Sequence, residues 1–251
     1  MPAAHHPVFN HPSNPSISIW RYMDFTKFVA LLESGALFFP RADKLGDPFE
    51  GSYSRGNESL RPEKYKKMYD EVEPELIRQI NENKATFAKW HRQWTFISCW
   101  HMNPAESAAM WQLYANSNEA VAIRSSFYRL ANALDEFTFI GTVEYIDFEK
   151  DWIPETNTFY PYVHKRLSFS HERELRAVYV ELPTNENGID MNAVPPDVGI
   201  EKPVNLNQLI ESVYVAPTSP VWFERLVKNV CHRYSLETNV HKSALDNEPF
   251  Y

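Results

Sequence analysis

Glycine is scarce in this sequence, and its scarcity excludes two common kinds of nucleotide-binding loop. Only seven glycines occur among the 251 residues. Neither G-x-G-x-x-G nor G-x-x-x-x-G-K-[ST] is present, and both patterns need glycine so that the backbone can lie close to a phosphate group. The sequence therefore contains no glycine-rich phosphate loop.

Cysteine is rarer still, because Cys99 and Cys231 are the only two. Cys99 lies in an apolar, strand-like run and Cys231 in a helical one, so two buried thiols are expected rather than a disulfide. Two cysteines are also too few for a cysteine-rich zinc site.

Long apolar runs are absent as well. The longest fall far short of the roughly 20 residues that a membrane-spanning helix requires, so no contact with a membrane is expected. The segment from Met1 to Ser16 is rich in His, Pro and Asn and has no apolar core, unlike a signal peptide. It predicts a flexible tail, and the chain as a whole is expected in the cytoplasm.

The balance of charge is acidic, with a formal net charge of −8. An acidic protein is poorly suited to broad contact with the phosphate backbone of a nucleic acid, although a local basic groove is compatible with this charge. A small nucleotide is therefore favoured over a nucleic acid as the partner.

Composition and periodicity together predict the fold class. The sequence is 43% hydrophobic, enough for one sizeable core. Strand-like and helix-like segments follow one another without a regular βαβ period, which predicts an α+β fold with a mixed, largely antiparallel sheet and packed helices. We expect a single domain over residues 17–251, within which residues 61–94 form a helical insertion broken at Pro74.

Capping residues place several helices within this domain. Asp24 and Gly35 flank a predicted helix over 25–34. The run Asn103-Pro104-Ala105-Glu106 combines an Asn cap, Pro at the first helical position and Glu two residues later, which predicts a helix start. A further helix is expected to end near Phe169, and residues 184–203 are expected to form a loop. The other expected strands and helices are 17–22, 36–39, 95–100, 120–124, 127–134, 137–146, 209–216, 221–232 and 240–244.

The segment from Ser170 to Leu182 is the most informative part of the chain. Its second half alternates between apolar faces, as a strand does. Extended backwards, the same period places Glu172, Glu174 and Arg176 on one face. Charges on an apolar face must be paired or must line a cleft, because an unpaired charge that leaves water costs several kcal/mol. This face is where chemistry is expected first, and a surface ladder of Arg and Glu is the alternative.

Six short blocks carry a resemblance to a known family. They are Ile19–Tyr22, Gly46–Glu50, Phe96–Trp100, Met110–Ala115 followed by Ala120–Ile123, Glu172–Arg176, and Val213–Pro217. In this order they resemble the bacterial domain of unknown function 2971 family. The resemblance spans about residues 17–244 and brings no established activity. This chain departs from the family pattern at Gly46, where Asn is usual, and at Ala120, where Gly is frequent.

A second, more distant resemblance suggests an activity. The strand-helix-strand pattern from Ile19 to Phe39, with Arg21 in its first strand, resembles the opening of ADP-ribosyltransferase folds. In those folds a first-strand Arg or His anchors NAD, and a Glu on a later strand polarises the ribose. The resemblance implies that Arg21 and Glu174 have these roles and that NAD is a substrate rather than a resident cofactor.

The chemistry of the side chains suits such a site. A guanidinium binds phosphate or ribose oxygens through several donors, and a carboxylate stabilises a developing positive charge. We expect Glu174, Arg21 and Glu172 to be catalytic, with the remaining site residues in contact with the substrate. Those residues are Arg176, Asp47, Glu50, Tyr22 and Trp111, the two aromatic side chains serving to stack on nicotinamide or a base.

Two alternatives remain open at this point. Asp47, Glu50, Glu172 and Glu174 are enough oxygen ligands for magnesium, which would make the protein a metal-dependent phosphodiesterase or nuclease, although Asp47 to Glu50 is equally well explained as a structural turn. The second alternative is a non-catalytic binding module of a defence or stress system. Among the histidines, His171 is the one to test as an acid or base because it adjoins the acidic row.

Overall fold

The computed structural model describes residues 3–68, 73–114 and 117–249. Met1 and Pro2 of the predicted tail, residues 69–72 of the predicted insertion, and Ala115 of the family-like block lie outside the described residues.

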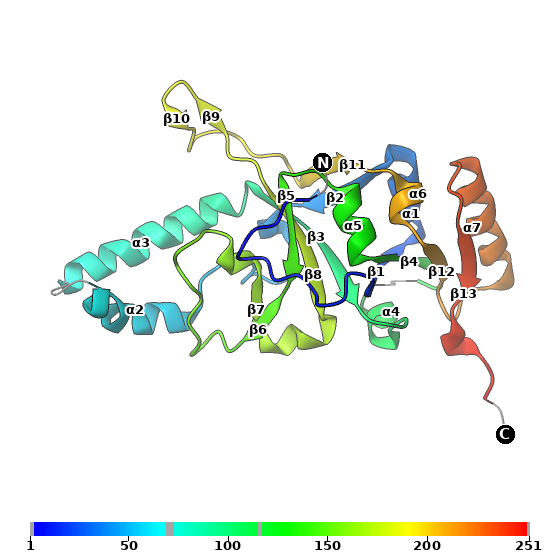
Figure 1. Cartoon of the computed structure of the whole chain (residues 1–251), viewed down its shortest axis with the longest axis horizontal. Helices are drawn as coiled ribbons and strands as arrows, with labels where there is room; N and C mark the ends of the chain where they lie inside the picture. The colour runs from blue at the N-terminus through cyan, green and yellow to red at the C-terminus, as the bar shows by residue number, and fades with distance from the viewer. Residues whose placement is uncertain (1–2, 69–72, 115–116, 250–251) are drawn as a thin grey trace.

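A seven-stranded sheet forms the centre of the molecule (Figure 1). Every neighbouring pair of its strands is antiparallel except β12 with β13, which is parallel. The α+β class and the largely antiparallel sheet are thus confirmed. In spatial order the strands are β13 (Asn239–Lys242), β12 (Ser212–Val215), β4 (Ala120–Ser126), β1 (Ser18–Asp24), β3 (Thr95–Met102), β8 (Glu174–Val180) and β5 (Thr138–Thr142).

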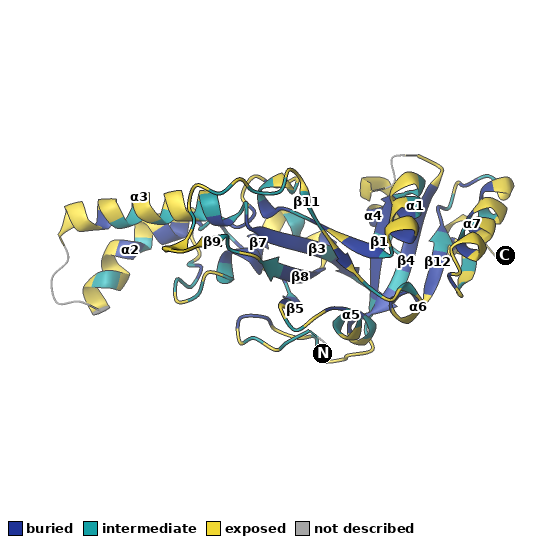
Figure 2. Ribbon diagram, turned by 90° about the horizontal axis from the view of Figure 1, so that it is seen from above, coloured by how far each residue is buried: buried dark blue, intermediate teal, exposed yellow. Residues whose placement is uncertain are grey.

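The main core lies between this sheet and four helices, α1 (Phe25–Ser34), α5 (Phe127–Ala133), α6 (Leu206–Leu209) and α7 (Val221–Arg233). Figure 2 shows their exposed outer faces and the buried strands beneath them. Helix α1 spans the predicted residues because its apolar side chains recur with helical spacing. Gly35 ends it in the left-handed conformation (φ 61°), and its N–H donates to the carbonyl of Leu31.

The predicted insertion forms an arm of two helices, α2 (Arg55–Met68) and α3 (Pro74–His91), which projects from one end of the molecule (Figure 1). The arm begins six residues before the predicted boundary, at Arg55. Its base is held by Glu155, whose carboxylate pairs with the guanidinium of Arg61 and accepts a hydrogen bond of 2.8 Å from the hydroxyl of Tyr65.

Small two-stranded sheets extend the architecture. β2 (Ala36–Pro40) pairs with β11 (Gly199–Pro203), β6 (Glu144–Ile146) with β7 (His164–Arg166), and β9 (Thr184–Asn185) with β10 (Gly188–Ile189). The prediction of a loop over 184–203 is therefore wrong at both ends. Gly199 permits the β2–β11 pair, because a Cβ there would lie 2.3 Å from the carbonyl oxygen of Phe39.

The N-terminal segment differs from the predicted flexible tail. From Ala3 onward the chain lies along β5, and Ala4 forms a β-bridge with Phe139. Phe9 is 1% exposed and packs on Phe139 and Phe159. Gly141 provides the room, since a Cβ at this position would lie 2.8 Å from the Cα of Phe9. Phe9 thus anchors this polar segment to the fold, although the segment has no periodic apolar pattern that would predict it.

The predicted helix start at Asn103 is also wrong, since α4 (Ala108–Tyr114) begins five residues later. Asn103 accepts a hydrogen bond from Arg173 (3.0 Å). Glu106 accepts one from the indole of Trp111 (2.9 Å) and another from the backbone N–H of Ala244 (2.7 Å). Asn103 and Glu106, which the sequence suggests as helix-capping residues, thus bond distant segments of the chain instead.

The expected helix ending near Phe169 is replaced by β7 and a 3-10 helix over Leu167–Glu172. The expected strand 137–146 is divided into β5 and β6, and the expected strand 209–216 is divided into α6 and β12. Lys165 and Arg166 of β7 form ion pairs with carboxylates of other elements, and such pairs are invisible to local periodicity.

Candidate functional site

A cavity of about 660 Å³ lies between β1, β3 and α1, and it brings together residues that are distant in the sequence. A volume of this size is typical of small-molecule sites. Aromatic side chains supply much of its wall, namely Trp20, Tyr22, Phe38 and Trp100. Its polar groups are Arg21, Lys27, Cys99, His101, Tyr114, Glu172, Glu174 and Glu201.

Arg21 contributes a cation to this cavity. Its guanidinium donates to the hydroxyl of Ser98 (3.2 Å) and to the carbonyl of Phe38 (3.0 Å), and it lies 5.9 Å from the ring centroid of Trp100. No carboxylate of the described residues forms an ion pair with it. Burial lowers the pKa of Arg21. A half-buried guanidinium with uncharged partners is suited to an anionic ligand.

The second charged feature of this region is a cluster of three carboxyl groups and two cations. Glu50 accepts two hydrogen bonds of 2.7 Å from Arg176, and Glu174 accepts one of 2.8 Å from Lys165. Glu174 also pairs with Arg176, and Glu172 pairs with Lys165. All five side chains are buried, Arg176 completely. We refer to Glu50, Lys165, Glu172, Glu174 and Arg176 as the carboxylate cluster.

The charges of this cluster balance only when one carboxyl group keeps its proton. Burial raises the pKa of Glu172 to about 7, aided by the hydrogen bond and negative charge of Glu174. Burial also acts to raise the pKa of Glu174, but the charges of Arg176 and Lys165 outweigh it and lower this pKa below its usual range. One carboxyl group thus stays ionised while its neighbour titrates near neutrality, as acid-base sites require.

Local backbone geometry brings these two carboxyl groups together. Glu174 and Arg176 share one face of β8, while Leu175 and Ala177 on the other face belong to the main core, as the alternation predicts. Glu172 precedes the strand, in the 3-10 helix. Arg173 between them adopts a left-handed conformation (φ 43°), which turns the chain, so Glu172 and Glu174 are neighbours although strand periodicity does not relate them.

The predicted site residues fall into two groups. Arg21, Tyr22, Glu172 and Glu174 line the cavity. Glu50, Arg176, Asp47 and Trp111 do not lie among its lining residues.

The polar groups of these four residues are engaged by other parts of the protein. Glu50 and Arg176 satisfy each other behind it. Asp47 accepts from Arg166 (2.7 Å) and from the backbone N–H of Phe49 (3.0 Å), as a structural turn would. Trp111 donates to Glu106 and packs edge-on against Tyr22 at 5.0 Å, so it supports the wall from behind.

His101 and Lys165 are the residues that sequence reasoning undervalued. The favoured histidine, His171, is exposed and stacks on Phe169. His101 instead lies directly opposite Glu174 in the β3–β8 register and lines the cavity. Continuing the predicted strand past Trp100 was the signal that could have found it. Lys165 gave no such signal, because its role depends on two carboxylates contributed by the turn and strand that follow.

Metal ligation is not supported by the arrangement of side chains. Within the part of the chain that the structure describes, no three His, Cys, Asp or Glu residues are grouped so as to hold a metal ion. The four carboxylates considered for magnesium are engaged by Arg166, Arg176 and Lys165 instead.

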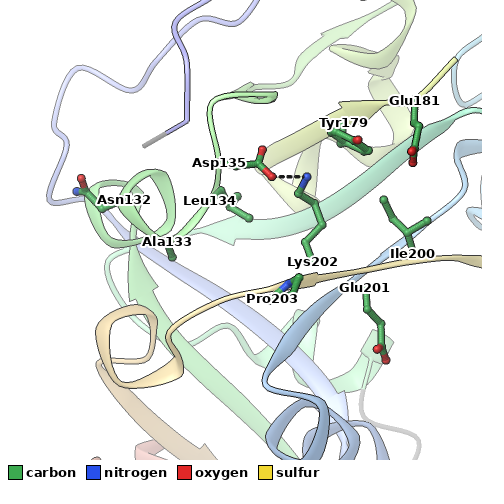
Figure 3. A pocket seen from close by; sticks show the side chains of 10 residues that line it. All are labelled: Asn132, Ala133, Leu134, Asp135, Tyr179, Glu181, Ile200, Glu201, Lys202 and Pro203. Carbon is green, nitrogen blue, oxygen red and sulfur yellow. Dashed lines mark ion pairs between the residues drawn. The ribbon is translucent and has the colours of Figure 1, made fainter. Parts of the chain in front are cut away.

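A second hollow of about 720 Å³ lies beside β11, between the ends of β8 and α5 (Figure 3). Its cation, Lys202, pairs with Asp135 at 2.7 Å and lies 3.6 Å from the ring centroid of Tyr179. None of the predicted site residues lines this hollow. The candidate site is therefore the cavity that contains Arg21 and Glu172.

Comparison of the chain with protein-family models, with curated proteins and with solved structures found no match. The resemblance to the domain of unknown function 2971 family stays a prediction. Among the described residues, no helix combines the length and the apolarity that a membrane crossing requires.

The raised pKa of Glu172 predicts how stability depends on pH. Between the usual carboxyl pKa of 4.5 and the folded-state pKa of about 7, the folded protein holds this proton and the unfolded chain does not. The stabilisation from Glu172 is therefore complete below about pH 4.5 and is lost as the pH rises through about 7. Urea denaturation across this range should show a loss of a few kcal/mol from this group.

Other groups change their protonation over the same pH range, so the contribution of Glu172 must be isolated with a variant that lacks its carboxyl group. Burial lowers the pKa of His91 to about 4 and also lowers that of His101, and these groups stabilise the fold as the pH rises. The relevant quantity is the free energy of unfolding of the wild type minus that of Glu172→Gln. If this difference does not decrease between about pH 4.5 and 7, Glu172 is not a proton-holding group.

Proposed function

We propose that the protein is an enzyme, a transferase or hydrolase that acts on NAD or a related nucleotide in the cavity. The observation that carries this proposal is the placement of Arg21, a cation without a carboxylate partner among the described residues, in the same cavity as Glu172 and Glu174. An anion-binding group and an acid-base pair on one cavity suit a phosphate-bearing substrate that is cleaved or transferred.

The cavity wall supplies a place for each part of such a substrate. Arg21 binds a phosphate, and Lys27 on α1 adds positive charge at the same wall. Lys27 is exposed, so it acts at the entrance rather than in the interior. The rings of Trp20, Tyr22 and Trp100 offer faces and edges against which a planar base can pack.

The carboxylate cluster then acts at the ribose. Water or an acceptor hydroxyl attacks C1 of the nicotinamide-bearing ribose, the C–N bond breaks, and its electron pair leaves with nicotinamide, which becomes neutral. Glu172 in its ionised form accepts the proton of the attacking group. Glu174 stays ionised, and its charge favours the positive charge that develops on the ribose. Both oxygens of Glu174 accept from cations, Lys165 and Arg176, which keep it ionised and weaken it as a nucleophile, so its contribution is electrostatic.

Ligand binding gives the first test of this function. NAD and ADP-ribose should each raise the melting temperature of the wild type, because a ligand that binds only the native state stabilises it by about 2.7 kcal/mol at a hundredfold excess over Kd. Magnesium alone should not. A shift with magnesium and none with either nucleotide would contradict the proposal and favour the phosphodiesterase alternative.

Arg21→Met supplies the matched variant for this test. We expect Kd for NAD to rise about 10- to 100-fold, the usual effect of losing a charge-assisted hydrogen bond. Without ligand, stability should fall by no more than about 1 kcal/mol, because the change removes a cation that has no anionic partner among the described residues. Arg55→Gln, on the exposed start of α2, is the control and should leave Kd unchanged.

A further inference from the structure

Helix α3 of the projecting arm carries an apolar row that is only partly covered within the protein. Five residues follow the alternating four- and three-residue spacing of a coiled-coil seam, namely Leu76, Ile80, Asn83, Phe87 and Trp90. We call them the α3 stripe. Leu76 is 48% and Phe87 38% exposed, Asn83 is exposed, and the other two are half-buried. Exposed apolar residues that occur singly need no explanation, but a row at this spacing marks an interaction surface.

A different face of α3 fastens the arm to the rest of the protein, and it does so with polar bonds. Asn81 accepts a hydrogen bond from the guanidinium of Arg61 on α2. Lys84 pairs with Glu155 at 3.2 Å. The α3 stripe is therefore available to a partner, and Figure 2 shows exposed residues along the length of this helix.

The distribution of charge favours a second copy of the same helix as that partner. In the first half of α3 two acidic residues, Glu75 and Glu82, stand against one Arg78. The second half carries Lys84 and Lys89 and no acidic residue. When two copies of α3 run antiparallel, the acidic half of each lies against the basic half of the other, and the two helix dipoles are oppositely directed. A parallel pair would bring like charges together.

The α3 stripe is also complementary to itself in the antiparallel direction. With a two-fold axis at Asn83, Ile80 of one copy lies against Phe87 of the other, and Leu76 lies against Trp90. Asn83 then faces its own counterpart, and the amide N–H of one can donate to the amide oxygen of the other. Such a contact uses the same surface on both copies and closes as a dimer. A polar residue within an apolar seam fixes the register at a cost in stability.

We propose that the protein forms a dimer through the α3 stripe, with the two arms paired antiparallel about an axis at Asn83. This inference stands apart from the proposed function, because none of the described residues of the arm lines the cavity. A pair of single helices is a small interface, so we expect a dissociation constant of about 1–100 μM.

Asn83 provides a matched set of variants, because it is exposed in the single chain. Asn83→Leu removes the polar pair from the seam and should lower the dissociation constant of the dimer at least about 10-fold. Asn83→Asp places two like charges at the axis and should raise this constant at least about 10-fold. Ala85→Asp, which is exposed on the far side of α3, is the control and should leave it unchanged. Sedimentation equilibrium of the full chain over micromolar concentrations measures all four constants.

Disulfide formation tests the direction of the helices. Oxidised Asn83→Cys should run as a dimer on a non-reducing gel. Leu76→Cys should stay a monomer, because an antiparallel pair places the two copies of this residue too far apart for a disulfide. The wild type, with Cys99 and Cys231, is the control.

Three results would overturn the proposal. The first is a wild type that sediments as a monomer of 29.3 kDa at every concentration. The second is a dimer whose dissociation constant neither Asn83 variant changes, since the α3 stripe would then not be its interface. The third is a dimer that Leu76→Cys cross-links, because the helices would then run parallel.

Discussion

Replacement of Glu174 by glutamine is expected to lower the free energy of unfolding by about 3–5 kcal/mol. Glu174 is buried and holds two cations, Lys165 at 2.8 Å and Arg176, which is fully buried. Glutamine has nearly the same size but no charge, so fully buried Arg176 loses a charged partner that Glu172, which pairs with Lys165, cannot replace. Urea denaturation near pH 6, the pH used for the control below, measures the effect.

The matched control is Glu172→Gln, two residues earlier in the same cluster. Below about pH 7 the Glu172 carboxyl is largely protonated, and an amide can donate to Glu174 in its place. Its stability should therefore change by about 1 kcal/mol or less near pH 6. Similar losses in the two variants would contradict the assignment of charge within the cluster. A large loss in Glu174→Gln alone would mark this residue as mainly an anchor and leave Glu172 as the acid-base group.

Replacement of Glu172 by glutamine is expected to reduce turnover of NAD by about 10²- to 10⁴-fold, the usual contribution of general acid-base catalysis. The fold should survive for the reason just given. In the wild type, kcat/KM should increase with pH and level off above about pH 7, because Glu172 acts as a base in its ionised form. The residual activity of the variant should lack this rise.

Glu181→Gln is the control for the loss of a negative charge, since Glu181 lies outside the cavity, beside the second hollow. Its kcat should equal that of the wild type. A wild-type profile that falls rather than rises through neutrality would contradict the role of Glu172 as a base, because it would require the protonated form.

Local patterns predicted those parts of the fold that local energetics decide. Residues 25–34 form the predicted helix because apolar spacing and the Gly35 cap act within one segment. The prediction failed where distant contacts decide. Phe9 anchors the N-terminal segment through β5 and Phe159, and Asn103 bonds Arg173 instead of capping a helix.

The site was predictable to a similar degree. Alternation in β8 indicated that Glu174 and Arg176 share a face, and burial of that charged face followed from it. Strand periodicity could not show that Arg173 turns the chain at Glu172, nor that Lys165 returns to hold both carboxyl groups. Nor could a single sequence show that β3 lies between β1 and β8, the arrangement that brings Arg21 and Glu174 to one cavity.

Release of nicotinamide from NAD, followed by chromatography, tests the central claim most directly. Wild-type protein should release nicotinamide, together with ADP-ribose or an ADP-ribosylated acceptor, and Glu172→Gln should release at least about 100-fold less while remaining folded. If wild-type protein binds NAD with a raised melting temperature but releases no nicotinamide, the cavity is a binding site only and the enzymatic account is wrong.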